Sequence, residues 1–296
     1  MEQKSTPAQA ASIRSAASIV MVRDGPTGLE VFLVKRHGLS DVHGGVFVFP
    51  GGKVDTHDAA PEIHERLDMS ATELHGALNE PDLSESAAAA LHIAAIREAF
   101  EETTVLYAQG ADEARAAVAW ELMREGRGFE EVAQMMGLRL QARRLQPWSR
   151  WITPPISSVG AVQRKRFDTR FFLATIPQGQ LPRHDGHEAV DSVWLAPRQA
   201  LQQYWDRQIE IAPPQMMSLI NLSHHDSVES ALAEAKARRP PLVRPEPRDH
   251  EDTRVVCYPG DEWHSVAQRA LPGPTRLILR NKRFEPIEGG FEALFE

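Results

Sequence analysis

Apolar and polar positions along the chain alternate in a way that predicts both strands and helices. Two runs rich in β-branched residues, AASIVMVRD (16–24) and GLEVFLVKR (28–36), flank the Gly- and Pro-containing stretch DGPTG, and we expect them to form a hairpin. A third strand is predicted in GGVFVFPGG (44–52). Pro50, Gly51 and Gly52 should close it, because these residues do not easily continue a β-ladder.

The clearest helical signal is DLSESAAAALHIAAIREAFEET (82–103), which is rich in Ala and Leu and offers Asp82 or Ser84 as an N-cap. Two further helices are predicted at 111–126 and 128–141, separated by Gly-Arg-Gly. The rest of the pattern predicts strands at 151–155, 167–177 and 191–196, helices with proline near their starts at 196–205 and 213–225, and short strands at 253–260, 275–281 and 284–289.

This mixed order of strands and helices favours an α/β sandwich with a mixed sheet. No Gly-x-Gly-x-x-Gly follows a predicted strand, which argues against a dinucleotide-binding fold. We expect residues 1–15 to be a disordered lead-in, 16–239 to form the main domain, and the Pro-rich segment 240–296 to be an extension of short strands that packs on it.

Composition narrows the classes of function. The chain has 296 residues, 42% of them hydrophobic, and its net charge of −8 argues against broad electrostatic binding to nucleic acid or to an anionic membrane surface. A single cysteine, Cys257, allows no intrachain disulfide and suits a reducing compartment. Neither a signal peptide nor a membrane span is apparent in the sequence, so we expect a cytoplasmic protein.

Three carboxylates crowd the end of the strongest helix. At 100° per residue, Glu98, Glu101 and Glu102 share one face, opposite the apolar stripe of the same helix, and Arg97 lies four residues before Glu101, where it can pair with it. A solvated acidic face is the simplest interpretation. However, like charges this close destabilise a helix unless a cation neutralises them, and oxygen ligands suit Mg²⁺ or Mn²⁺ bound together with phosphate groups.

The segment PGGKVD (50–55) followed by REAFEETTV (97–105) resembles the sequence box of the Nudix hydrolases. The chain departs from that box in three places. Asp58 stands where the family usually has glutamate, Thr104 where it has glycine, and residues 59–96 replace a usual spacer of seven residues, an insertion of about 31 residues. This insertion, with RFDTRFFLA, DSVWLAPRQAL and APPQMMSL downstream, resembles the coenzyme A diphosphatases of peroxisomal type and their bacterial relatives.

The resemblance implies roles for these residues. Glu101 and Glu102 would bind the divalent metal, Glu98 would be a further ligand, and the carbonyl of Gly51 would supply another oxygen. Arg97 would orient the glutamates, and water would attack one phosphorus of a diphosphate. Glu188, six residues before Trp194, is a candidate general base, although a loop acid without a role is an equal alternative.

The residues that recognise the substrate are harder to identify from the sequence. Basic residues gather in RLQARRLQPWSRW and VQRKRFDTR, namely Arg143, Arg144, Arg150, Arg164, Lys165, Arg166 and Arg170. They could hold further phosphates, and Trp148 or Trp151 could stack on adenine. A solvated basic surface with two core tryptophans is the alternative. Arg36, in a stretch that partly resembles the substrate signature of coenzyme A Nudix enzymes, is a further candidate.

These features predict a metal-dependent pyrophosphohydrolase that takes a small-molecule diphosphate. We expect coenzyme A or acyl-coenzyme A to give 3′,5′-ADP and (acyl) 4′-phosphopantetheine. Two alternatives stay open: an ADP-ribose, NADH or nucleotide-sugar hydrolase using the same metal site, and a Nudix ligand-binding module that has lost catalysis. Insertions at about 59–83 and 110–146 would be a lid, a homodimer contact or neither.

Overall fold

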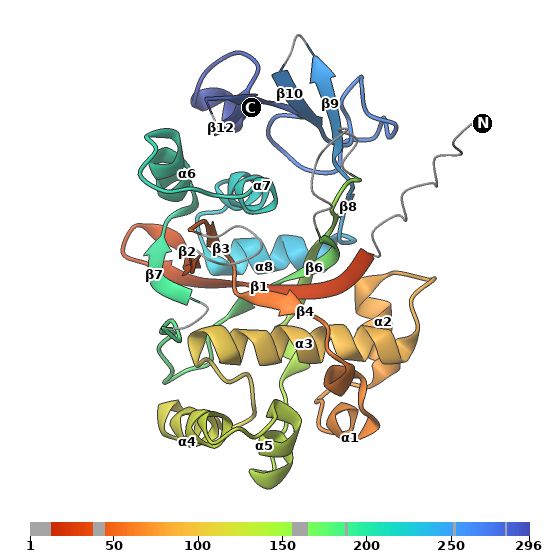
Figure 1. Cartoon of the computed structure of the whole chain (residues 1–296), viewed down its shortest axis with the longest axis vertical. Helices are drawn as coiled ribbons and strands as arrows, with labels where there is room; N and C mark the ends of the chain where they lie inside the picture. The colour runs from red at the N-terminus through yellow and green to blue at the C-terminus, as the bar shows by residue number, and fades with distance from the viewer. Residues whose placement is uncertain (1–12, 38–44, 156–164, 187–188, 251–252, 282) are drawn as a thin grey trace, which may run out of the picture.

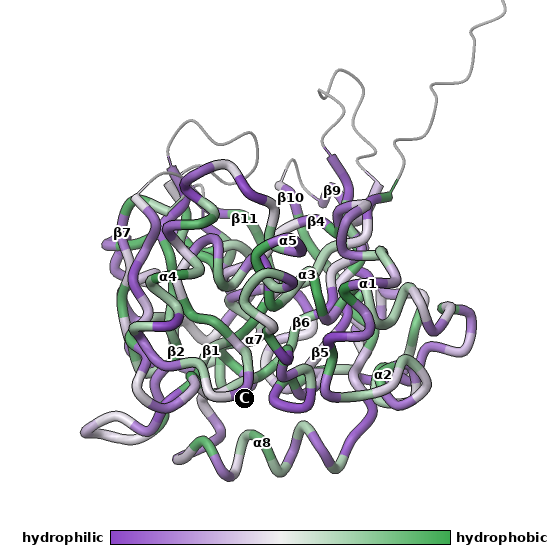
Figure 2. Tube along the Cα trace, turned by 90° about the horizontal axis from the view of Figure 1, so that it is seen from below, coloured by the Kyte–Doolittle hydropathy of each residue, from purple (hydrophilic) through white to green (hydrophobic). Residues whose placement is uncertain are grey.

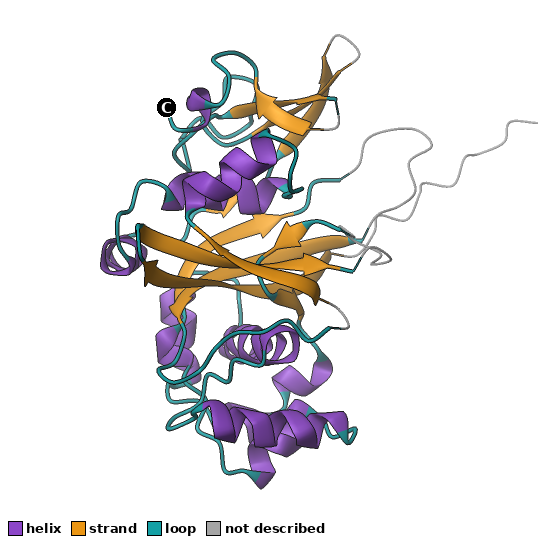
Figure 3. Cartoon of the chain, turned by 90° about the vertical axis from the view of Figure 1, so that its left-hand side faces the viewer, coloured by secondary structure: helices purple, strands orange, loops and turns teal. Residues whose placement is uncertain are grey.

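The computed structural model describes residues 13–296 except 38–44, 156–164, 187–188, 251–252 and 282. The lead-in predicted for 1–15 therefore lies almost wholly outside the described residues. A twisted mixed sheet forms the middle layer of the molecule (Figure 3). One face is covered by a long helix and the inserted helices, the other by further helices, and a small second sheet stacks beyond these (Figure 1). The expected α/β sandwich with a mixed sheet is confirmed.

Within the described residues the central sheet has eight strands, in the order β3-β2-β1-β6-β5-β8, with β4 paired to β1 and β7 to β2. Their bounds are β1 (Ile13–Gly25), β2 (Gly28–Arg36), β3 (Phe47–Val48), β4 (Gly51–Lys53), β5 (Gln146–Ile152), β6 (Arg166–Thr175), β7 (Ala189–Leu195) and β8 (Leu242–Val243). The predicted hairpin is confirmed, since β1 and β2 are antiparallel with Gly25 opposite Gly28. On its other side β1 pairs in parallel with β6.

The chain around Pro50 differs from the prediction. Pro50, Gly51 and Gly52 were expected to end a strand, but the ladder resumes at once as β4, with Gly51 opposite Ser18 and Lys53 opposite Ala16. Pro50 donates no hydrogen bond, yet its carbonyl accepts from the Ile19 N–H at 2.9 Å and from Ser18 Oγ at 2.7 Å. The proline thus switches the chain from pairing with β2 to pairing with β1.

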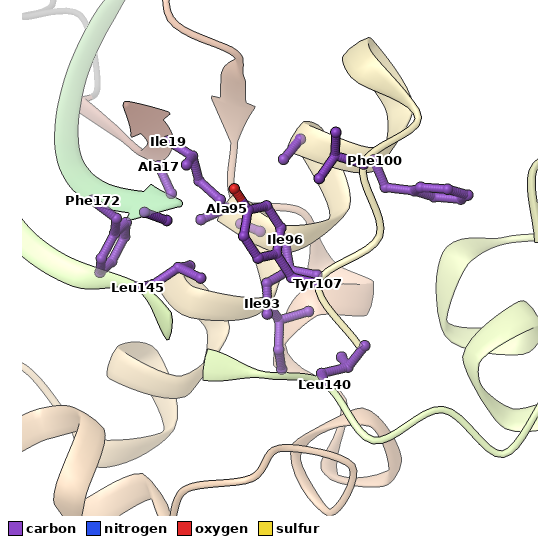
Figure 4. Packing of buried hydrophobic residues seen from close by; sticks show 14 of the residues in the cluster. Ala17, Ile19, Ile93, Ala95, Ile96, Phe100, Tyr107, Leu140, Leu145 and Phe172 are labelled. Carbon is purple, nitrogen blue, oxygen red and sulfur yellow. The ribbon is translucent and has the colours of Figure 1, made fainter. Parts of the chain in front are cut away.

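The long helix is α3 (Glu85–Thr103), and Ser84 is its N-cap, with Oγ accepting from the Ala87 N–H at 3.1 Å. Ile93, Ile96 and Phe100 of its apolar stripe are fully buried. The His92 ring of α3 contacts Phe172 of β6, whereas Phe100 points away from the labelled β1 and β6 residues (Figure 4) and contacts Trp120 and Phe129 of the second predicted insertion. Helix α3 is thus buried on two sides, by the sheet and by the insertion, and this burial, rather than helix propensity alone, fixes its orientation.

The two insertions lie together on the α3 side of the sheet. The first forms η1 (Thr56–Ala59), α1 (Pro61–His64) and α2 (Ala71–Leu78), and the second α4 (Glu113–Arg124), α5 (Phe129–Met135) and η2 (Ala142–Arg144). They are joined through the backbone, because Asp68 N–H donates to the Leu140 carbonyl at 2.9 Å and Leu140 N–H donates to that of Arg66 at 2.7 Å. The helix predicted at 111–126 is confirmed. The one predicted at 128–141 is confirmed in its first half only, since α5 ends at Met135 and Gly137 takes a left-handed conformation with φ of 59°.

The opposite face carries α6 (Pro197–Trp205), α7 (Pro213–Leu222) and α8 (Val228–Ala237), and the prolines predicted at the starts of α6 and α7 occupy the first turn. Helix α8, which the sequence interpretation missed, is capped by Ser227 and alternates hydrophobic and hydrophilic residues (Figure 2). No helix in the described part of the chain is long and apolar enough to cross a bilayer.

The C-terminal segment forms β9 (Glu246–His250), β10 (Thr253–Cys257), β11 (Arg276–Arg280), β12 (Arg283–Pro286) and η3 (Glu292–Leu294), with the four strands in one antiparallel sheet. Three of these strands were predicted and β9 was not. Side chains of this segment share a hydrophobic core with α7 and β5, including Val256, Tyr258, Leu277 and Leu294.

A buried ion cluster anchors the first insertion to the sheet. Glu80, just after α2, accepts from Arg170 Nε and Nη2 at 3.0 and 2.5 Å and from Arg150 Nη1 at 2.8 Å. Both arginines also bond Asp168. The Arg170 side chain is only 4% exposed, so removing one partner leaves charge buried without compensation.

We predict that Glu80→Gln lowers the free energy of unfolding by about 3 kcal/mol, because two arginines then share the single carboxylate of Asp168. Urea unfolding measures this. The control is Glu121→Gln, which breaks an exposed pair with Arg124 and should change stability by less than about 0.5 kcal/mol. Equal effects of the two substitutions would contradict the anchoring role.

Buried His92 makes stability depend on pH. Its Nδ1 donates to the Ala88 carbonyl at 2.8 Å, and burial lowers its pKa to about 4 from 6.5. The unfolded chain therefore takes up a proton at a higher pH than the folded chain does. Stability is fully present above pH 6.5 and is lost as the pH falls toward 4.

We expect wild-type protein to lose about 1.4 kcal/mol more than His92→Leu does when the pH is lowered from 7.5 to 5.5. Urea unfolding of both proteins at the two pH values measures this difference. The other titrating groups are the same in both proteins, so their contributions cancel. Parallel losses in the two proteins would show that His92 is not the source.

Candidate functional site

A cleft of about 920 Å³ opens on the face of the sheet opposite α3. Its floor is formed by alternate residues of two parallel strands, in the cross-strand pairs Arg14–Phe167, Ala16–Thr169 and Ser18–Phe171. At one edge the floor meets the Gly51–Gly52 turn and the carboxylates of α3, and the start of α7 forms a wall beside it. The cleft thus brings together both halves of the predicted motif.

The two glycines allow backbone and carboxylates to meet closely. Gly51 N–H donates to Glu102 Oε2 at 3.0 Å. Gly51 has φ of +156°, and a Cβ there would lie 2.5 Å from the Ala17 carbonyl oxygen, while a Cβ on Gly52 would lie 2.5 Å from the Glu98 carboxyl carbon. A larger residue at Gly51 would push the turn away from β1, and one at Gly52 would push it away from Glu98 of α3.

Arg97 connects every part of this site. Its Nη1 donates to Glu98 Oε1 and to Glu101 Oε2, each at 2.8 Å, and its Nη2 donates to the Lys53 carbonyl at 3.1 Å. Its Nε and Nη2 also form a two-pronged bond with Asp58, at 2.8 and 2.9 Å. The guanidinium therefore holds the α3 acids, the glycine turn and the first residue before the insertion in one arrangement.

Asp58 is the position at which the motif departs from its usual glutamate. It is 1% exposed, and besides bonding Arg97 it accepts from the Asp55 N–H at 2.7 Å through Oδ2, completing a capping box at the start of η1. The shorter side chain reaches Arg97 because this turn begins directly beside it. The insertion starts from a fixed point and does not separate the turn from α3.

The acidic residues of α3 do not form the solvated face that is the simplest interpretation of the sequence. Glu98 and Glu102 are 8% and 3% exposed. The pKa of Glu101 is raised to about 7, because burial and the charge of Glu98 raise it more than Arg97 lowers it. A single guanidinium thus serves three carboxylates, those of Asp58, Glu98 and Glu101, which favours the binding of a further cation.

These residues fit a hard divalent cation. The donors are carboxylate and carbonyl oxygens, and the glycine turn leaves room for them to meet. Within the described part of the chain, however, no group of three acidic, His or Cys side chains is arranged to hold a metal ion without rearrangement. The contacts explain this, since Arg97 draws Glu98 and Glu101 while the Gly51 N–H holds Glu102. Cation binding requires at least one carboxylate to turn from its present partner.

Thr104, in place of the usual glycine, keeps the turn out of the helix. It takes the left-handed conformation with φ of 60°, and its N–H donates to the Phe100 carbonyl at 2.8 Å. A β-branched residue is strained there. The turn is therefore retained at a cost in stability rather than lost.

Cationic side chains line one end of the cleft. Arg14, Lys53 and Lys165 lie there, and Arg36 lines the cleft near β3. Arg166 donates through Nε to the carbonyl of Thr153, a cleft residue, at 3.0 Å. Sequence reasoning gave no role to Lys53, although it lies within the motif segment PGGKVD. It missed Arg14 because only the pairing of β1 with β4 and β6 brings that residue beside the motif.

Trp148 lies away from the cleft, so the prediction that it stacks on adenine is wrong. Its ring is fully buried, with the Arg238 guanidinium 4.5 Å from its centroid, so no face is left for a base. Trp151 is likewise buried, against Tyr258. Phe49, Phe167 and Phe171 are the aromatic residues that line the cleft in the described structure.

The other basic candidates have different surroundings. Arg150 and Arg170 belong to the Glu80 ion cluster, and Arg143 donates to the carbonyl of Asp68 at 3.2 Å. Arg164 and Glu188 lie outside the described residues, so their predicted roles stay predictions.

Comparison with known proteins gives consistent matches. The family model described as the NUDT19 Nudix domain matches residues 8–222. Acyl-coenzyme A diphosphatase NUDT19 of Xenopus laevis is 27% identical over 299 residues, covering 87% of this chain and 77% of the relative. The Gallus gallus protein of the same name is 27% identical over 246 residues, covering 69% and 64%. The crystal structure of a NUDIX hydrolase from Alicyclobacillus acidocaldarius, 27% identical, superimposes with a TM-score of 0.60 over 75% of this chain and 96% of that one.

We predict that Thr104→Gly raises the free energy of unfolding by up to about 1 kcal/mol, because strain relief exceeds the extra freedom of glycine in the unfolded chain. Thermal unfolding measures the change. Asn79, in the same conformation at the end of α2, is the control: Asn79→Gly should have a smaller effect, since asparagine tolerates left-handed backbone. Destabilisation by Thr104→Gly would contradict the strain at this position.

Proposed function

The chain belongs to the NUDT19 Nudix domain family and is a Nudix hydrolase, and from this premise we propose that it cleaves the diphosphate of coenzyme A or acyl-coenzyme A. Water adds to one phosphorus as the bridging P–O bond breaks, giving 3′,5′-ADP and (acyl) 4′-phosphopantetheine. The names of the curated relatives support this substrate.

One observation carries the proposal: Arg97 bonds Asp58, Glu98 and Glu101 at the same time, across the long insertion. A chain that had kept the fold only to bind a ligand would need neither this arginine nor the buried acids. Their burial costs free energy, which a substrate-bound cation would offset. We therefore favour an enzyme over a binding module.

We assign different roles to the residues of the cleft. Gly51 N–H and Arg97 fix the directions of the carboxylates of Glu102, Glu98 and Glu101, which are the proposed ligands of the cation together with the Gly51 carbonyl. When bound, Mg²⁺ or Mn²⁺ would neutralise charge on the diphosphate and activate water. Glu188 remains our candidate general base.

The cationic end of the cleft suits a substrate with several phosphates. Arg14 and Phe167 are paired across β1 and β6, and Lys53 and Lys165 line the same cleft. We propose that this end holds the nucleotide, with its 3′-phosphate among the basic side chains and its base on Phe167. Arg36, Arg164 and Arg166 stay in this proposal as further phosphate contacts.

We also propose that residues 16–239 are the catalytic domain and 240–296 an extension packed on it. The shared core supports this division, since Val256, Tyr258 and Leu277 of the extension pack with Met216 of α7. The two inserted segments are held together by backbone bonds. A homodimer contact through them remains a proposal without a specific contact to support it.

We expect Glu102→Gln to lower kcat for coenzyme A at least about a hundredfold, because the neutral side chain binds a divalent cation poorly. Chelation of divalent metal should abolish wild-type activity, and Mg²⁺ or Mn²⁺ should restore it. Mass detection of 3′,5′-ADP and 4′-phosphopantetheine measures turnover, and Glu121→Gln on exposed α4 is the control.

Activity of Glu102→Gln within a few-fold of wild type would overturn the metal-site assignment. Faster hydrolysis of ADP-ribose, NADH or a nucleotide sugar than of coenzyme A would keep the enzyme class and replace the substrate. Absence of hydrolysis with every one of these diphosphates would favour the binding module.

A further inference from the structure

The start of α7 forms a wall of the cleft, and the sheet holds it there. Phe47 N–H in β3 donates to the Glu210 carbonyl at 2.8 Å, and Phe47 and Ile211 form a parallel bridge. Helix α7 then begins with Pro213 and Pro214, and its N-cap residue Ala212 offers no side-chain cap. Gln215 follows in the first turn and lines the cleft with Ala212 and Pro214.

Gln215 carries a buried polar atom with no partner. The residue is 8% exposed, and its side-chain oxygen Oε1 accepts no hydrogen bond in the structure. Gln180 provides the contrast: at 7% exposed, it accepts from the Leu106 N–H at 2.8 Å and donates to the carbonyls of Leu106 and Ala111, each at 2.9 Å. Buried amides are ordinarily satisfied as Gln180 is, so an unsatisfied one that lines a cleft suggests a ligand partner.

The residues around Gln215 indicate what kind of ligand would hydrogen-bond to its side-chain oxygen. Val48, Phe49 and Phe171 line the cleft along with Ala212 and Pro214, and all of them are apolar. The basic residues lie farther along the floor: Arg14 is four residues before Ser18, the partner of Phe171, a distance of about 13 Å along a strand. The α7 end therefore suits a largely apolar group that carries neutral hydrogen-bonding atoms.

We propose that Gln215 Oε1 accepts a hydrogen bond from an amide N–H on the apolar arm of the substrate, the arm joined to the diphosphate opposite the nucleotide. This assignment rests on the proposed function for the identity of the arm. It names a specificity-determining residue that the motif does not contain. In the free protein the unsatisfied carbonyl costs stability, and the bound arm removes that cost.

The test is Gln215→Leu, which keeps the shape of the side chain approximately and removes its polar atoms. We expect KM for coenzyme A to rise about tenfold with kcat little changed, because the contact is made equally in the bound substrate and the transition state. We also expect the melting temperature to be unchanged or higher, because no bond to Oε1 is lost. Gln180→Leu is the matched control: it should lower the melting temperature and leave KM within twofold. A lower melting temperature for Gln215→Leu with KM retained would assign Gln215 a structural role and overturn the proposal.

Binding of the two products to metal-free protein separates this proposal from the proposed function. By calorimetry, Gln215→Leu should weaken 4′-phosphopantetheine about tenfold and leave 3′,5′-ADP within twofold. That result supports the arm site even if wild-type protein hydrolyses no coenzyme A. Weakening of 3′,5′-ADP instead would mean that Gln215 reads the purine amino group, and unchanged binding of both products would mean that it contacts neither. Each of these two results overturns the proposal.

Discussion

The bonds of Arg97 are the constraint on which the rest of the site depends. Burial opposes the charge of its guanidinium, but Asp58, Glu98 and Glu101 together hold its pKa above the ordinary value. The side chain is planar and always charged, so it can donate to several oxygens in fixed directions at once. Glu98 and Glu101 therefore have defined orientations, and the glycine turn, whose Gly51 N–H holds Glu102, stays against the helix through the bond from Arg97 to the Lys53 carbonyl.

Ion pairs of this kind also explain how a long insertion is tolerated inside a catalytic motif. A loop costs little closure entropy when its ends are already close, and here both ends are tied. Asp58 is bonded to Arg97 at the start of the insertion, and Glu80 is bonded to Arg170 and Arg150 near its end. Between them, α1 and α2 bury apolar residues against α3 and contact the second insertion. The inserted helices are thus part of the support for α3.

Local sequence predicted the parts of the structure that local physics decides. The α3 cap at Ser84, the β1–β2 hairpin and the prolines that start α6 and α7 each depend on a few neighbouring residues. The motif likewise identified Gly51, Arg97 and the three glutamates. Residues that depend on tertiary pairing were not found: β4 exists because β1 accepts a second partner, and Arg14 and Gln215 reach the cleft through β6 and β3. Trp148 was misjudged because sequence alone does not reveal that Arg238, which follows α8, covers it.

Our central proposal is that Arg97 and Asp58 keep a metal site intact across the insertion. A crystal structure with Mn²⁺, read through anomalous scattering, tests this most directly. We predict an ion in contact with the carboxylate of Glu102 and the carbonyl of Gly51, at about 2.2 Å, with the two-pronged Arg97–Asp58 bond unchanged. An ion bound elsewhere in an active crystal, or an Arg97 released from Asp58 when the ion binds, would contradict it.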